Sequence, residues 1–314
     1  MQIQIQQVKD ESQWHDLLCQ SPYSYHGHSL EYQKIIDMNK GTTSAWQNLL
    51  ITIDDEQYIC PLEIGGVKLY SHLKYYAGLI PINESKRLKE ATRVLFEAIK
   101  KGGYSGMVLS YLQGDPIGEQ VATYGGQIAR FQGWELASLF DTTKSYDDIY
   151  KKVYDCKARN MIRKAEKNGI TCRQIQILNH VKDAVDCTKS KPERHGSVMP
   201  VYYRDEELYQ QRQKALSAIL GGQLISFGAF VGDKMVAYIN TIRSHHEAII
   251  SNLLSHADYW KYAVNNKLFD EVIKYYCEDK EIKHLMYSFD GVAGVDMFKK
   301  SIGFKGVPVM RYIF

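Results

Sequence analysis

Residues 157–169 read Lys-Ala-Arg-Asn-Met-Ile-Arg-Lys-Ala-Glu-Lys-Asn-Gly. On a helix, Arg159, Arg163 and Lys167 lie at positions i, i+4 and i+8, so their charges form one basic ridge. The alanines and the isoleucine form a second face suited to packing, and Asn168-Gly169 provides a helix stop. Like charges at this spacing repel by roughly 0.2–0.5 kcal/mol per pair. The ridge therefore predicts either a ligand-facing helix, where arginine holds an anion, or a solvated basic face.

The charge distribution around this segment is uneven, and it leaves both alternatives open. Residues 151–173 contain eight basic and two acidic side chains, whereas the whole chain has a net charge of only +3. A basic segment on a slightly acidic body indicates an anionic partner. Within this segment we expect Arg159, Arg163 and Lys164 to bind the substrate.

The basic segment separates two halves with the same order of expected elements. Each half reads strand, two helices, three antiparallel strands, helix, strand, helix, strand. In the second half the expected strands are residues 171–177, 224–231, 235–242, 248–254, 284–289 and 306–313, and the expected helices 179–189, 205–220, 259–277 and 292–302. We therefore predict a first domain at 1–145, a connecting helix at 146–170 and a second domain at 171–314. At 314 residues, two domains are also the default for this length.

This order of elements resembles the GNAT fold (Gcn5-related N-acetyltransferase). Two tandem copies resemble the Fem family, the aminoacyltransferases that build peptidoglycan cross-bridges, and related acyltransferases. Residues 157–169 are similar to that family's "R-N-I-R-K-A-x-K-x-G" helix, and Asp296-Met-Phe-Lys-Lys-Ser-Ile-Gly-Phe304 to its "F-K-x-x-F-G" segment, with Ile302 in place of the usual Phe. The resemblance implies an α/β fold of two GNAT-like domains with mixed, mostly antiparallel sheets.

The same resemblance implies that Phe298 and Lys299 face the substrate channel, Phe298 as a binding residue and Lys299 as a catalytic one. A lysine is a mobile point charge that suits a diphosphate or a carboxylate. The alternative is that Phe298 belongs to the core and that Lys299 and Lys300 are surface residues.

Further candidates come from their places beside the expected strands and loops. Asp290 follows the strand that ends at Phe289, where strand ends often present catalytic groups, and Tyr287 lies on that strand. Arg194 and His195 lie in a polar loop, and His195 could act as a general base. Each could equally be an ordinary strand or loop residue.

Tyr76 is a candidate lining residue of the first half's cleft, although a core position is the simpler interpretation.

The acyl donor is left open by the sequence. Acetyl-coenzyme A enzymes of this fold usually place a glycine-rich loop before the long helix, where backbone N–H groups hold the pyrophosphate. At that junction the chain has Ser255-His-Ala-Asp-Tyr-Trp260 in one half and Leu79-Ile-Pro-Ile-Asn-Glu84 in the other, both without glycine. The donor could be acyl-coenzyme A or aminoacyl-tRNA, and no insertion is long enough to form the tRNA-binding arm of some Fem proteins.

Composition narrows the class of protein further. The six cysteines are scattered without a Cys-x-x-Cys pair, which argues against a disulfide framework or a zinc site, and we expect no metal. No apolar run reaches the roughly 18–20 residues of a membrane span, and the N-terminus has no signal-peptide pattern, so a cytoplasmic location is expected.

The predicted function is transfer of an acyl or aminoacyl group onto an amine of a cell-envelope precursor. The acceptor would be linked to a nucleotide diphosphate or a lipid diphosphate, and tRNA is a candidate partner. Two alternatives stay open: a coenzyme A-dependent N-acyltransferase acting on an amino sugar, and a non-catalytic protein that binds an anionic ligand. The oligomeric state is not predicted.

Overall fold

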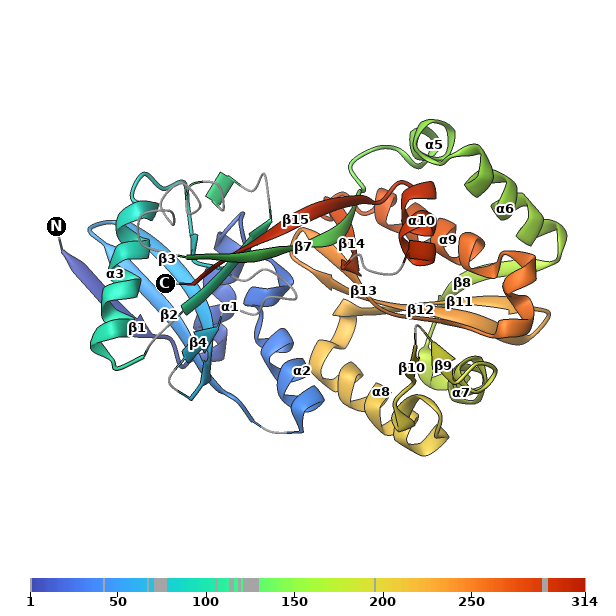
Figure 1. The fold of residues 1–314 in the computed structure, drawn as a ribbon, viewed down its shortest axis with the longest axis horizontal. Helices are drawn as coiled ribbons and strands as arrows, with labels where there is room; N and C mark the ends of the chain where they lie inside the picture. Colours follow the sequence, from blue (N-terminus) through green and yellow to red (C-terminus); the bar gives the residue numbers. More distant parts are fainter. Residues whose placement is uncertain are drawn as a thin grey trace. The chain divides into compact units, whose positions relative to one another are not determined.

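The computed structural model describes residues 2–41, 43–66, 68–70, 78–104, 107–112, 116–117, 120, 130–194, 196–289 and 293–313. The chain divides into two compact units. Unit 1 contains Met1–Leu136 and Val307–Phe314, and unit 2 contains Ala137–Gly306. Each unit is an α/β body with its own core and its own stretch of the strand order (Figure 1).

The sheet of unit 1 has the strand order β1-β2-β3-β4-β6-β15, and a short strand β5 pairs with β3. All neighbours are antiparallel except β4 and β6, which are parallel. The strands are β1 (Ile3–Gln7), β2 (Ala45–Ile53), β3 (Glu56–Gly65), β4 (Lys68–Tyr70), β5 (Ile80–Pro81), β6 (Met107–Leu112) and β15 (Lys305–Ile313). The predicted turn at Asp54-Asp55 joins β2 to β3, which confirms that hairpin.

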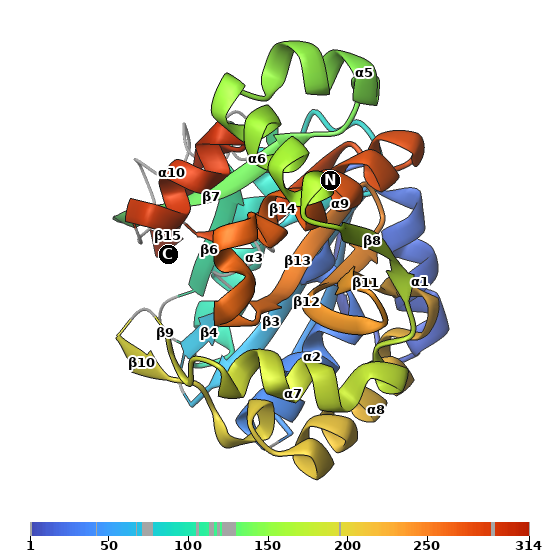
Figure 2. The ribbon, with the colours of Figure 1, turned by 90° about the vertical axis from the view of Figure 1, so that its right-hand side faces the viewer.

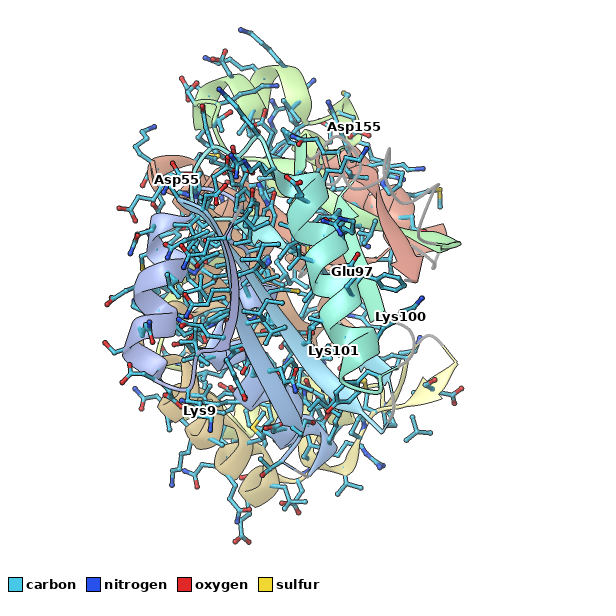
Figure 3. The ribbon with its side chains drawn as sticks, turned by 90° about the vertical axis from the view of Figure 1, so that its left-hand side faces the viewer. Lys9, Asp55, Glu97, Lys100, Lys101 and Asp155 are labelled. Carbon is cyan, nitrogen blue, oxygen red and sulfur yellow. The ribbon has the colours of Figure 1, made fainter. Side chains whose placement is uncertain are left out.

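Helices with one apolar face cover this sheet. They are α1 (Glu11–Gln20), α2 (Leu30–Lys40) and α3 (Leu88–Lys101). Ser29 caps α2 as predicted, because its side chain accepts a hydrogen bond from the backbone N–H of Tyr32. In α3, Ala91 and Leu95 are fully buried, whereas Glu97, Lys100 and Lys101 lie on the exposed side (Figure 3).

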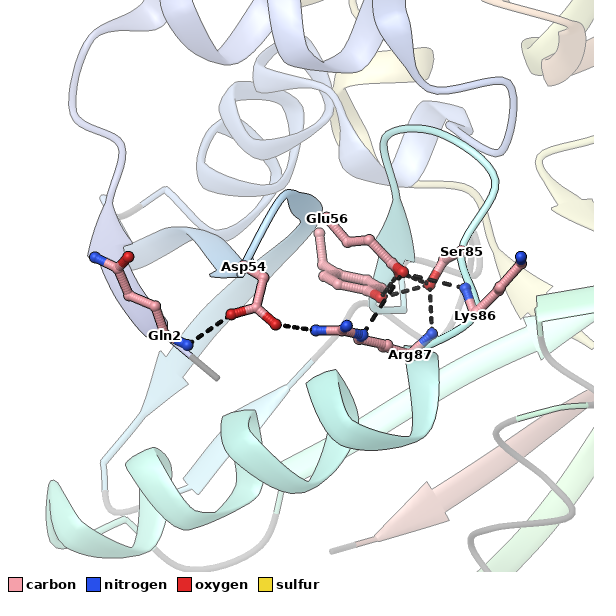
Figure 4. A network of polar contacts seen from close by, with 7 residues as sticks. Gln2, Asp54, Glu56, Ser85, Lys86 and Arg87 are labelled. Atoms are coloured by element: carbon pink, nitrogen blue, oxygen red, sulfur yellow. Dashed lines mark hydrogen bonds and ion pairs between the residues drawn. The ribbon is translucent and has the colours of Figure 1, made fainter.

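A polar network holds the β2–β3 turn against the start of α3 (Figure 4). The guanidinium of Arg87 pairs with Asp54, whose carboxylate also accepts a hydrogen bond from Gln2 N at 2.7 Å. Glu56 accepts hydrogen bonds from Tyr58 Oη (2.6 Å) and Ser85 Oγ (2.8 Å). Burial alone would raise the pKa of Glu56, but these hydrogen bonds outweigh it and lower that pKa.

The sheet of unit 2 has the order β7-β14-β13-β12-β11-β8. Its strands are β7 (Arg130–Asp141), β8 (Ile170–Ile175), β11 (Leu224–Val231), β12 (Lys234–Ser244), β13 (Glu247–Ser255) and β14 (His284–Phe289). β13 and β14 are parallel, and the other neighbours are antiparallel. The hairpin predicted across Gly232-Asp233 is confirmed.

Helices cover both faces of this sheet (Figure 2). One face carries α6 (Cys156–Lys167) and α9 (Val264–Glu278), and the other carries α7 (Val181–Lys189) and α8 (Glu206–Leu220). Tyr238 and Ile239 are neighbours in β12, yet they belong to the cores on opposite faces. The two faces therefore have separate hydrophobic cores.

The two sheets share one strand order, including the parallel pair, as predicted for a duplicated fold. They also exchange their last strands. β6 of unit 1 pairs with β15, which follows unit 2 in the sequence, and β14 of unit 2 pairs with the end of β7. The predicted boundaries at residues 145 and 170 therefore differ from the units, because strand pairing places 137–145 in unit 2 and 307–314 in unit 1.

The expected connecting helix is also part of unit 2. Ala158, Ile162 and Ala165 of α6 are buried in the same core as Leu268 and Val272 of α9. The helix is an integral layer of that unit, because its apolar face packs on α9.

The long helix expected at 259–277 begins later than predicted. Ala257–Tyr262 forms a 3₁₀ helix (η7), and α9 starts at Val264 after Ala263, which has a left-handed backbone with φ of 60°. The change of direction carries no glycine or proline, so the sequence pattern gave no signal for it.

Candidate functional site

The candidate site of unit 2 lies where two parallel strands separate. β13 and β14 pair from Glu247 with His284 to Ile249 with Met286, but β13 continues to Ser255. The register of β13 against β12 also shifts between Ile250 and Asn252, which leaves Ser251 as a bulge. Among the described residues, the edge of β13 beyond Ile249 therefore has backbone groups outside its ladder with β14, which can bond an extended ligand.

A pocket of about 450 Å³ occupies this position. Every residue that lines it belongs to unit 2. They come from the ends of β13 and β14, the loop after α7, the segment before α9, the first turn of α9, and α10 (Ala293–Ser301): Lys191, Arg194, Leu253, Ser255, Trp260, Ala263, Asn265, Asn266, Tyr287, Gly294, Val295 and Phe298. Two of the lining side chains are cationic and none of the described ones is acidic, so the pocket favours an anionic ligand.

One wall of the pocket is built on Arg194. Its Nη2 donates hydrogen bonds to the carbonyl oxygens of Cys187 (2.8 Å) and Ser255 (2.9 Å), which fixes the guanidinium between α7 and the end of β13. Burial lowers the pKa of Arg194, and its buried Nε has no hydrogen-bond partner among the described residues.

The indole of Trp260 joins Arg194 in this wall. The rings and charges are close: Lys191 Nζ lies 4.9 Å and Arg194 Cζ 5.5 Å from the centre of the indole. Trp260 Nε1 donates to Ser255 Oγ at 2.8 Å, and the side chain is still 39% exposed. The wall thus presents an aromatic surface between two cations.

The N-terminus of α9 forms a second wall. Ala263 adopts the left-handed conformation that glycine usually supplies, and it turns the chain into the helix. Asn265 and Asn266 of the first turn line the pocket, and Asn265 Oδ1 is buried without a hydrogen-bond partner in the described part of the chain. Because a helix N-terminus carries a partial positive charge, this wall also favours an anion. The junction before α9 has no glycine, but Ala263 still makes the turn that places the helix N-terminus at the pocket.

Tyr287 and Phe298 form the apolar floor. Both pack on Phe269 of α9, with ring centres 5.2 Å and 5.1 Å away. Burial raises the pKa of Tyr287 to about 12, so its hydroxyl keeps its proton at neutral pH. A protonated phenol in the pocket can donate a hydrogen bond or a proton to a bound ligand.

Lys299 lies beside the pocket but is not a lining residue. Its side chain is 3% exposed, and its Nζ lies 4.9 Å from the centre of the Tyr287 ring and 3.8 Å from Asp296 Oδ1. The surface alternative for Lys299 is therefore wrong, and its contact with the pocket runs through Tyr287.

The basic ridge of α6 is not one uniform surface. Arg159 is half-buried, and its Nη1 donates to the carbonyl oxygens of Tyr150, Lys151 and Tyr154, so its guanidinium is occupied by backbone. Arg163 and Lys164 are exposed. No residue of α6 lines the pocket, so binding of substrate by Arg159, Arg163 and Lys164 stays a prediction.

The structure brings together three of the sequence candidates, Arg194, Tyr287 and Phe298, in one pocket. His195, Asp290 and Tyr76 lie outside the described residues.

The other lining residues were not among the sequence candidates: Lys191, Leu253, Ser255, Trp260, Ala263, Asn265, Asn266, Gly294 and Val295. The pair Asn265-Asn266, which follows an aromatic run, is a sequence signal for polar groups at the start of the long helix. The expectation for that junction rested on glycine alone.

Two further observations concern the described part of the chain alone. It contains no cluster of three or more histidine, cysteine, aspartate or glutamate side chains placed to hold a metal ion. Among its helices, none combines the length and the apolar character needed to cross a bilayer.

Comparison with solved structures identifies the fold. FemX matches over 100% of this chain and 97% of its own, with a TM-score of 0.73 and 10% sequence identity. A conserved protein of unknown function from Bacteroides thetaiotaomicron matches over 100% of both chains, with a TM-score of 0.63 and 14% identity. A tandem GNAT protein from the clavulanic acid biosynthesis pathway covers 100% of this chain and 98% of its own, with a TM-score of 0.54 and 12% identity. No protein-family model and no curated protein matches the sequence.

The predicted fold class is thereby confirmed. The chain consists of two tandem GNAT-like units with mixed, mostly antiparallel sheets, and it shares this fold with FemX.

Proposed function

We propose that the protein transfers an acyl or aminoacyl group onto an amine, and that the pocket of unit 2 binds the donor. The observation that carries this proposal is the pocket of about 450 Å³ between the separating strands β13 and β14, at the N-terminus of α9. There the free edge of β13 can bond an extended acyl carrier, while α9, Lys191 and Arg194 attract its phosphates. The acceptor class we propose is a cell-envelope precursor linked to a diphosphate, since residues 157–169 and 296–304 resemble motifs of the Fem family.

The proposed reaction forms a C–N bond between the acceptor amine and the donor carbonyl. The C–S bond of a thioester or the C–O bond of an aminoacyl ester breaks, and the amine loses a proton. Backbone N–H groups of the β13 edge are placed to stabilise the charge that develops on the carbonyl oxygen. The phenol of Tyr287, which keeps its proton, donates a hydrogen bond that stabilises the charge on the leaving thiolate or alkoxide.

The base that takes the amine proton is not among the described lining residues, because none of them carries a carboxylate or an imidazole. Asp290 and His195 remain our candidates for this role.

The experiment that tests the proposal is donor binding by a variant with a blocked pocket. Gly294 lines the pocket in the first turn of α10, and a Cβ built on it meets no atom within 4 Å. Gly294→Leu therefore introduces a bulky side chain at the pocket from a position where its Cβ has open space. It should not lower stability, since leucine is a better helix former than glycine by up to about 1 kcal/mol.

Thermal unfolding is measured with acetyl-coenzyme A and with aminoacyl-tRNA. A donor at a hundred times its dissociation constant should stabilise the wild type by about 2.7 kcal/mol and Gly294→Leu by much less. Gly222→Leu is the matched control, because Gly222 also has open space around it but precedes β11 at the opposite end of the sheet. The proposal fails if neither donor stabilises the wild type, or if both leucine variants respond like the wild type.

A further inference from the structure

A second pocket, of about 390 Å³, lies in unit 2 away from the residues of the donor pocket. We call it the lysine pocket. It is lined by the end of β7, the π-helix η3 (Ile149–Val153) and the turn from α10 into β15: Leu139, Phe140, Asp141, Lys144, Lys152, Val153, Lys300, Gly303, Phe304 and Lys305. The two pockets share no lining residue.

Four lysines and one carboxylate line this pocket, so its net charge is strongly positive. Lys144 lies 3.6 Å from Asp141, and Lys152 lies 2.7 Å from Asp148. Both pairs are exposed, with side-chain exposures between 50% and 74%, so each contributes little and can exchange partners. Lys300 and Lys305 are exposed, and no carboxylate of the described chain pairs with either. Four ammonium groups around one concave site repel one another unless an anion visits.

The backbone of the pocket is constrained in two places. Gly303 has a left-handed φ of 94°, and a Cβ there would lie 2.3 Å from Val153 Cγ1, so only glycine allows this close approach. Lys152 lies on a π-helix, a rare element that is frequent at functional sites. Arg159 holds the carbonyls of this π-helix and of Tyr154, which fixes the segment that carries Lys152.

We propose that the lysine pocket binds a diphosphate group. A lysine ammonium is a point charge and, unlike an arginine guanidinium, does not require a planar ligand group such as a carboxylate. Several lysines around one concave site match the multiple charges of a diphosphate. The aromatic floor of Phe140 and Phe304, whose ring centres are 5.4 Å apart, leaves room for the group attached to the diphosphate. The inference rests on the proposed function for the acceptor's diphosphate and places that group in a pocket separate from the donor pocket, so pyrophosphate binding and donor binding can fail independently.

The test is calorimetric titration of the full chain with sodium pyrophosphate. It is run at about 0.01 M salt, where charges act over about 30 Å, and at about 0.15 M, where they act over about 8 Å. Lys300→Ala/Lys305→Ala should weaken binding at least about tenfold, as expected for lost charge-assisted contacts. Inorganic phosphate should bind more weakly than pyrophosphate. UDP and farnesyl diphosphate, titrated separately, show whether a nucleotide or a lipid carries the group.

Two control variants decide the location. Lys182→Ala/Lys214→Ala removes the same charge from exposed positions on α7 and α8 and should leave binding within about twofold of the wild type. Lys191→Ala removes a cation of the donor pocket, so it should reduce only the pyrophosphate bound there and leave the binding at the lysine pocket. The proposal is overturned if the wild type does not bind pyrophosphate, if the α7–α8 control loses as much affinity as the Lys300/Lys305 variant, or if Lys191→Ala alone abolishes binding.

Discussion

Lys299 provides the sharpest test of how the donor pocket works. The substitution Lys299→Met keeps a long side chain at a position that is 3% exposed and removes only the charge. It deletes a cation 4.9 Å above the Tyr287 ring, worth up to about 2 kcal/mol in a dry site. It also removes one ion-pair partner of Asp296, whose side chain is 19% exposed, so the loss should be smaller than the roughly 3–5 kcal/mol of a fully buried pair. Because the 3.8 Å separation from Asp296 is long for an ion pair, we expect a total loss of about 3–4 kcal/mol in unfolding free energy.

The effect on turnover separates a positioning role from a purely structural one. If Lys299 orients Tyr287 at the pocket, Lys299→Met should lower kcat/KM at least about tenfold after correction for the folded fraction. Urea denaturation gives the stability, and amide formation with the donor found by the binding screen gives the rate. Asp296→Asn is the matched variant, because it weakens the same pair but keeps the cation over Tyr287, and it should lower stability with little loss of kcat/KM.

A double-mutant cycle between Lys299→Met and Tyr287→Phe completes this test. If Lys299 acts through Tyr287, the two losses in kcat/KM should overlap, and the double variant should be little worse than Tyr287→Phe alone. Strictly additive losses, or an unchanged kcat/KM for correctly folded Lys299→Met, would refute the reasoning and leave Lys299 a stability residue.

Two further predictions follow from the packing. Arg159→Ala should lower the unfolding free energy by about 2 kcal/mol, because it leaves backbone carbonyls of the π-helix without a donor, whereas the exposed Arg163→Ala should leave stability unchanged and weaken only anion binding at low salt. Urea midpoints of both variants check this, and equal stabilities would contradict it. The lowered pKa of Glu56 means that its hydrogen bonds stabilise the fold above about pH 4.3, its usual value, and that this contribution is lost as pH falls through the folded pKa. Unfolding measured from pH 6 to pH 3 (about the range of carboxylate titration) should show a smaller loss for Glu56→Gln than for the wild type, and identical slopes would exclude the contribution.

Much of the fold could be predicted from the sequence, because local patterns determine local elements. The strand predicted at His284–Phe289 and the strand Leu224–Val231 have the expected bounds. The shared order of elements also predicted the shared strand order of the two sheets. The partner of each final strand was not predictable, because a strand carries the same alternation of residues whichever neighbour it pairs with.

The candidate site was predicted only in part for a related reason. Tyr287 and Phe298 were found through their strand and their motif, and Arg194 through its loop. The surroundings of a charged side chain are set by tertiary packing, so the sequence did not show that Arg159 binds backbone or that Lys299 is buried. The left-handed Ala263 was hidden because alanine gives no turn signal.

The exchange of final strands also has a consequence for biosynthesis. Residues 1–136 contain most of unit 1, but β6 lacks its outer neighbour until β15 has been translated. β15 follows unit 2 in the sequence, so β6 has no partner on that side while some 170 further residues are synthesised. Synthesis proceeds at about 5–20 residues per second. During those seconds the exposed edge of β6 is a template for pairing with another chain. Synthesis from the N-terminus thus leaves a period in which misassembly can occur, and this period ends only when β15 pairs with β6.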